Sequence, residues 1–97
     1  MDLFHGSRFQ LEPGYVLDGR EAPADQGIGT EDGYVYASVR WEVAAMFAEL
    51  AQGPSTPAIY LVEPLEALER DPDELDAAGS WRSARMRVIA PAMHQPA

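Results

Sequence analysis

The segment Gly33 to Gln52 joins a β-like run to the clearest amphipathic helix of the chain. Aromatic and β-branched residues follow the glycine, which predicts a strand with Tyr34 and Tyr36 on one face. Ser38 carries a hydroxyl that can accept hydrogen bonds from free amides of a first helical turn. It is therefore predicted to be the N-cap of a helix that begins at Val39.

Apolar residues recur in this helix at intervals of three and four, which predicts a buried face made of Val43, Met46, Phe47, Leu50 and Ala51. Glu42 and Glu49 lie two turns apart on another, hydrated face. Gly53 suits the left-handed position after a last helical turn, and Pro54 cannot continue the hydrogen-bond ladder. The helix is therefore expected to end just before these two residues.

Shorter apolar runs predict further strands. The first ends at His5, with a turn at Gly6, where the missing side chain would also let a ligand approach the backbone. A second covers residues 15–17, and alternation predicts a last strand over residues 85–89. The continuous apolar run 58–62, bounded by prolines, predicts a strand covered on both faces.

Short strands around one main helix predict a compact α+β fold. The 97 residues suffice for one core, so we expect a single domain over residues 1–90 and a flexible tail over residues 91–97. Residues 18–32 are rich in Gly, Pro and acids and are predicted to form a loop. Connections of this length are usually functional or mobile.

The formal net charge of -9 makes a broad nucleic-acid-binding surface improbable. All seven basic residues are Arg, and three of them, Arg82, Arg85 and Arg87, lie close together. Either their charges offset nearby acids on a solvated face, or their planar guanidinium groups bind a phosphate or carboxylate. The chain has no apolar run of membrane-spanning length, no leader and no cysteine, so we expect a cytoplasmic monomer without a membrane partner.

Three residues stand out as candidates for chemistry. His5 precedes a glycine, which fits either a ligand contact or an ordinary histidine with one hydrogen bond. Tyr36 falls at the end of a predicted strand, where binding groups are often displayed. Asp71 belongs to an acid-rich segment that is otherwise typical of a solvated face, and Pro72 favours an extended backbone there. No metal site is expected, because His5 and His94 are far apart and the acids lack the spacing of a calcium loop.

Several segments, in one order along most of the chain, resemble the rifampin ADP-ribosyltransferase family, a small branch of the NAD-dependent ADP-ribosyltransferases. These segments are Phe-His-Gly-Ser at 4–7, the stretch 11–17, the strand and Ala-rich helix over 35–51, Ile-Tyr-Leu-Val-Glu-Pro at 59–64 with Asp-Pro at 71–72, Ser-Trp-Arg-Ser at 80–83, and Arg-Val-Ile at 87–89. The resemblance implies an ADP-ribosyltransferase-like fold and an enzyme of the glycosyltransferase class.

In such enzymes the bond between nicotinamide and ribose of NAD breaks, and ADP-ribose passes to an acceptor hydroxyl. The resemblance implies that His5 hydrogen-bonds the adenosine ribose and that Tyr36 stacks on the nicotinamide. Asp71 would stabilise the positive charge of an oxocarbenium-like transition state and orient the acceptor. The backbone of Gly6 would bond the nicotinamide amide, and Ser7 and Arg82 are further candidate NAD contacts.

The acceptor implied by the resemblance is a rifamycin-like antibiotic. The segment between Pro72 and Ser80 is shorter than in the family, which leaves two other interpretations open. One is a non-catalytic module that binds NAD or ADP-ribose. The other is a toxin or phage effector that modifies a protein.

Overall fold

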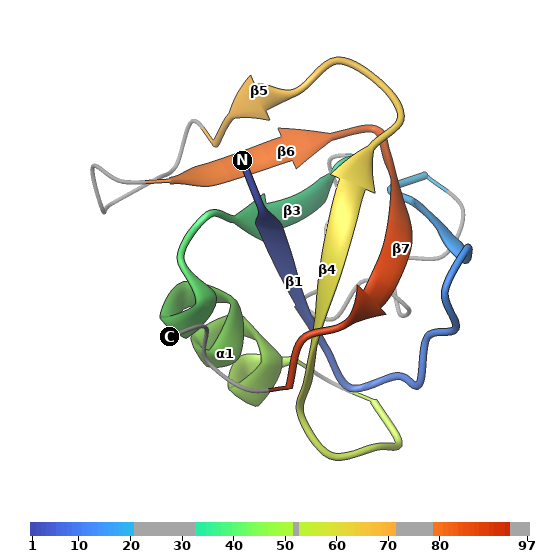
Figure 1. Ribbon diagram of the computed structural model, residues 1–97, viewed down its shortest axis with the longest axis vertical. Coiled ribbons are helices and arrows are strands. Elements are labelled where there is room, and N and C mark those ends of the chain that lie inside the picture. The colour runs from blue at the N-terminus through green and yellow to red at the C-terminus, as the bar shows by residue number, and fades with distance from the viewer. Residues whose placement is uncertain (21–32, 52, 72–78, 94–97) are drawn as a thin grey trace.

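The computed structural model describes residues 1–20, 33–51, 53–71 and 79–93. Within them the elements are β1 (Leu3–Ser7), β2 (Val16–Asp18), β3 (Val35–Ser38), α1 (Trp41–Leu50), β4 (Ala58–Pro64), β5 (Glu69–Arg70), β6 (Ser80–Ser83) and β7 (Arg85–Pro91). The strands form one antiparallel sheet in the order β2-β7-β4-β1-β3-β6-β5, and α1 packs beside β1 (Figure 1). The predicted α+β fold is confirmed. The described helix is not long and apolar enough to cross a membrane.

The sheet is weakly joined in its middle. β1 pairs with β4 along its whole length, from Leu3 to Ser7, but its register with β3 consists of the pair Phe4 and Ser38. Figure 1 shows the consequence: β3, β6 and β5 run across the direction of β1, β4 and β7. We call the separation of β1 from β3 beyond this pair the sheet split.

β1 continues through Gly6 to Ser7, so the predicted turn at Gly6 is wrong. Gly6 pairs with Ile59 on β4, and α1 lies against its other side. A Cβ atom at Gly6 would lie 2.2 Å from the carbonyl oxygen of Ala44 and 2.6 Å from the amide nitrogen of Ala48. The absence of a side chain at Gly6 is therefore explained by the close approach of a helix to a strand.

That close approach also decides which face of α1 is buried. The apolar periodicity predicted that Met46 and Leu50 would be buried, yet they are 51% and 65% exposed. The fully buried helical residues are Ala44 and Ala48. Only small side chains fit between the two backbones at this distance, so Met46 and Leu50 are turned outward. Of the other residues predicted for the buried face, Val43 and Phe47 are half-buried and Ala51 is buried as predicted.

α1 begins at Trp41, two residues later than predicted, with Arg40 as its N-cap and no side-chain cap. Ser38 instead accepts a hydrogen bond from the Arg40 amide at 3.0 Å, which closes a turn ahead of the helix. The predicted left-handed Gly53 is also wrong, because the helix ends at Ala51 in an extended conformation. Arg8 caps the end from outside by donating to the carbonyls of Ala48 and Glu49, each at 3.2 Å.

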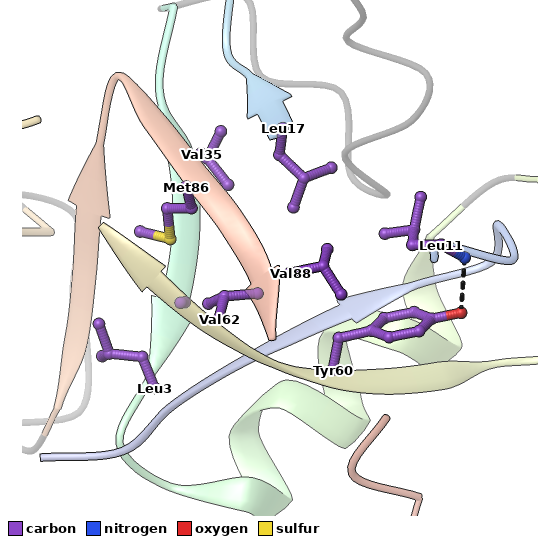
Figure 2. Close-up of a cluster of buried hydrophobic side chains, with 9 residues drawn as sticks. Leu3, Leu11, Leu17, Val35, Tyr60, Val62, Met86 and Val88 are labelled. Carbon is purple, nitrogen blue, oxygen red and sulfur yellow. Dashed lines mark hydrogen bonds between the residues drawn. The ribbon is translucent and has the colours of Figure 1, made fainter. Parts of the chain in front are cut away.

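Two hydrophobic clusters cover the sheet. The larger one (Figure 2) joins strands from both sides of the sheet split and consists of Leu3, Leu11, Leu17, Val35, Ala37, Tyr60, Val62, Met86 and Val88. The smaller one lies against α1 and consists of Phe4, Ala44 and Ile59. Ile59 and Tyr60 are neighbours on β4 and are both buried, one in each cluster. The predicted burial of this strand on both faces is confirmed at its centre.

The described C-terminal residues are hydrogen-bonded to the rest of the domain beyond residue 90, where the domain was predicted to end. β7 extends to Pro91, and the Ala92 amide donates to the Ile59 carbonyl at 2.7 Å. The Trp41 indole in turn donates to the Ala92 carbonyl at 2.7 Å. The tail predicted to begin at residue 91 is thus ordered as far as Ala92, because strand pairing and α1 both hold it. The predicted loop 18–32 overlaps β2 at Asp18, and most of it lies outside the described residues.

Candidate functional site

His5 lies on β1 at the sheet split, and its side chain is hydrogen-bonded to the neighbouring strand β3. Its Nδ1 is 2.8 Å from the backbone carbonyl oxygen of Tyr36 on β3. A carbonyl can only accept, so Nδ1 carries the proton and donates it. Burial lowers the pKa of His5, against a smaller upward effect of this hydrogen bond. The imidazole is therefore neutral at pH 7, and Nε2 is a hydrogen-bond acceptor.

Nε2 of His5 is buried and has no hydrogen-bond partner among the described residues. Buried polar atoms in proteins are nearly always paired, so an unpaired one calls for an explanation. The bond at Nδ1 alone is what an ordinary core histidine would make. The unpaired acceptor at Nε2 is not explained in this way. A ligand hydroxyl could donate a hydrogen bond to it.

The neutral state of His5 predicts a pH dependence of folding. Because burial holds the pKa of His5 in the folded protein below the ordinary histidine value of about 6.5, the unfolded chain binds the proton more readily. The free energy of unfolding should be constant above about pH 6.5 and fall below it, by at most about 1.4 kcal/mol per pH unit. Urea denaturation between pH 5 and 7.5 measures this slope. In His5→Asn the slope over this range should be lost, and an unchanged slope would contradict the assignment.

Tyr36 belongs to a cluster on the β3, β6 and β5 side of the sheet, which we call the Arg82 cluster: Tyr34, Tyr36, Glu69 and Arg82. Val35 and Ala37 are buried in the larger core, so alternation turns the Tyr36 side chain to the opposite face of β3. Arg82 on β6 lies directly opposite Tyr36 in the register, and its guanidinium carbon is 4.0 Å from the centroid of the Tyr34 ring. The prediction that both tyrosines share a face is confirmed by this arrangement.

The guanidinium of Arg82 is held by protein groups. Glu69 Oε1 accepts from Nε at 3.2 Å and from Nη2 at 3.0 Å. The pKa of Arg82 is raised, chiefly by a hydrogen bond to the Tyr36 side chain and then by Glu69. The other two arginines of the sequence cluster form exposed ion pairs, Arg85 with Glu66 and Arg87 with Glu63. For Arg85 and Arg87, the interpretation as charges offset on a solvated face is supported.

Asp71 follows β5 at the edge of the sheet, and its amide donates to the Ser80 carbonyl at 3.0 Å. Directly paired residues share a face, so the pairs of Arg82 with Glu69 and Tyr36 place those three side chains on one face. Asp71 is two residues beyond Glu69 and shares that face by alternation. Since β5 lies two strands from β3, the backbones of these two strands are about 10 Å apart across the sheet. Pro72, which singled out Asp71 in the sequence, lies outside the described residues.

The predicted site residues are thus brought together in two groups. His5 is bonded to the backbone of Tyr36, while Arg82 and Asp71 share the face that carries the Tyr36 side chain. Ser7 is buried, and its hydroxyl accepts from the Phe9 amide at 3.0 Å. For Gly6 and Ser7 the structure shows structural contacts, and their NAD contacts stay predictions.

Sequence reasoning missed two members of the Arg82 cluster. Tyr34 was placed on the face of Tyr36 by alternation but was given no role. Glu69 lay in the acid-rich segment and had no local signal, because its partner Arg82 is 13 residues away. Among the described residues, no group of three or more His, Asp or Glu side chains could hold a metal ion.

The comparisons with known proteins agree with the resemblance seen in the sequence. Over residues 3–90 the chain matches a family model described as Arr-ms, rifampin ADP-ribosyl transferase. A search of curated proteins finds no match. The family match covers nearly the whole chain, from the start of β1 to the penultimate residue of β7. The chain therefore belongs to the rifampin ADP-ribosyl transferase family.

Proposed function

We propose that the protein is an NAD-dependent ADP-ribosyltransferase that acts on a hydroxyl of a rifamycin-like acceptor. The observation that carries the proposal is the buried Nε2 of His5, an acceptor that no described residue satisfies. NAD presents ribose hydroxyls that can donate to it. The family match supports the reaction type, and the description of the family supports the acceptor.

NAD as the co-substrate supplies the ADP-ribose group, with nicotinamide as the leaving group. His5 accepts a hydrogen bond from the adenosine ribose through Nε2, because Tyr36 fixes its other nitrogen as a donor. The ring of Tyr36 holds the nicotinamide by stacking. Asp71 stabilises the positive charge that develops on the reacting ribose and orients the acceptor. Nε2 is covered in this structure, so a ligand must displace the atoms around it.

The direct test is to incubate the protein with NAD and rifampicin, and in parallel with NAD and cell lysate. Release of nicotinamide, together with a rifampicin adduct heavier by one ADP-ribose in mass spectrometry, is the expected result. Label transferred to a protein band but never to rifampicin would favour a protein acceptor. NAD binding without turnover would favour a non-catalytic module, and absence of any NAD binding would refute the proposal.

His5→Asn separates the two nitrogens of the imidazole. The asparagine amide nitrogen occupies the δ position and can still donate to the Tyr36 carbonyl, but no acceptor remains at the ε position. We expect NAD and ADP-ribose to bind about tenfold more weakly, and to a similar extent, since they share the adenosine ribose. Titration calorimetry with both ligands measures this. A loss limited to NAD would place His5 at the nicotinamide instead.

A further inference from the structure

We propose that Arg82 is a positioning residue that fixes the orientation of the Tyr36 side chain, rather than a contact of the NAD diphosphate. The inference rests on the proposed function, because it concerns how this chain holds the ring that stacks on nicotinamide. It also replaces the sequence-based expectation that Arg82 itself binds the cofactor. Arg82 has three neighbours that bear on this role: Tyr36, Glu69 and Tyr34.

The first neighbour is Tyr36 itself. Arg82 and Tyr36 are direct partners of β6 and β3, so their Cβ atoms lie about 5 Å apart on one face. At this separation the guanidinium can reach the Tyr36 hydroxyl, and interaction with that side chain is the largest cause of the raised pKa of Arg82. A tyrosine on a strand can otherwise turn about two side-chain bonds, so a fixed partner at its hydroxyl limits where the ring can lie.

The other two neighbours hold Arg82 in place. Glu69 on β5 accepts from two nitrogens of the guanidinium, and the Tyr34 ring covers its flat face at 4.0 Å. Glu69 also offsets the positive charge at close range. An arginine whose charge is matched and whose face is covered attracts a diphosphate less than a free one does. The same contacts make it a well-fixed support for Tyr36.

The side chain must be arginine for this role. Lysine would keep the charge but would lose the planar fork that reaches Glu69 and Tyr36 at once, and it would pack less well against the Tyr34 ring. Arg82→Lys therefore separates orientation from charge. Arg85→Lys is the matched control, because Arg85 also pairs with a glutamate, Glu66, but belongs to no part of the Arg82 cluster.

The experiment compares the affinities of NAD and ADP-ribose, which share the diphosphate but differ in nicotinamide. In Arg82→Lys we expect NAD to bind about five- to tenfold more weakly, while the affinity for ADP-ribose changes less than about twofold. In a Tyr36→Leu background, Arg82→Lys should cause no further loss of NAD affinity. Arg85→Lys should change neither affinity. Thermal unfolding checks that each variant is folded, and Glu69→Gln, expected to act in the same direction, replaces Arg82→Lys if that variant does not fold.

Each other outcome overturns the proposal in a recognisable way. Equal losses for NAD and ADP-ribose would show that Arg82 contacts the shared diphosphate. Unchanged affinities in Arg82→Lys would show that Tyr36 needs no support. An additional loss in the Tyr36→Leu background would show that Arg82 acts independently of Tyr36. If the unmodified protein binds ADP-ribose but not NAD, or neither ligand, the proposed function fails as well, which separates that failure from the three above.

Discussion

Asp71→Asn is expected to leave NAD affinity nearly unchanged and to lower turnover about a hundredfold or more. The substitution keeps the size of the side chain but removes the charge that would stabilise a cationic ribose in the transition state. An interaction made only in the transition state affects kcat and not binding of the ground state. Asp71 is half-buried beside β6, and its amide donates a hydrogen bond to the Ser80 carbonyl. The backbone position of residue 71 should therefore not change in the variant.

The neighbouring acids provide the control for this prediction. Asp73→Asn and Asp76→Asn should change turnover little, although both residues lie outside the described part of the chain. Nicotinamide release at saturating NAD, together with calorimetric affinity, measures both quantities. Normal turnover in Asp71→Asn combined with an essential neighbouring acid would show that the family's acidic residue is assigned to the wrong position. Turnover that depends on none of these acids would favour the non-catalytic module.

Gly6→Ala is expected to lower the free energy of unfolding by about 3 kcal/mol or more, the upper range for overpacking a tight core. The added methyl group would meet backbone atoms of Ala44 and Ala48, which cannot move aside without shifting α1 from β1. Urea denaturation monitored by circular dichroism measures the change. NAD affinity in this variant should fall only as far as the folded fraction falls.

Gly14→Ala is the matched control for that substitution. Gly14 has a φ of 92°, but a Cβ atom there would have no neighbour within 4 Å. Its replacement should cost about 1–2 kcal/mol, through the left-handed backbone alone. If Gly6→Ala were as stable as the unmodified protein yet failed to bind NAD, the reason for glycine at this position would be ligand approach and not helix packing.

The sequence by itself determined the α+β class, the family and the positions of most elements. Local rules suffice for these features, because alternation, apolar periodicity and turn residues act over a few neighbouring positions. The common face of Tyr34 and Tyr36 and the two-sided burial of β4 were predicted on these grounds and are confirmed. The order of family segments also identified His5, Tyr36 and Asp71 as the residues to locate in the structure.

The tertiary structure decided what local periodicity could not. The buried face of α1 was predicted from its large apolar residues, but the close contact with Gly6 selects Ala44 and Ala48 instead. The state of His5 likewise depends on a carbonyl 31 residues away, and the neighbours of Arg82 come from two other strands. A sequence pattern ranks residues by their own hydrophobicity and spacing, whereas burial, protonation and ion pairing depend on which distant segments the fold brings within a few ångströms.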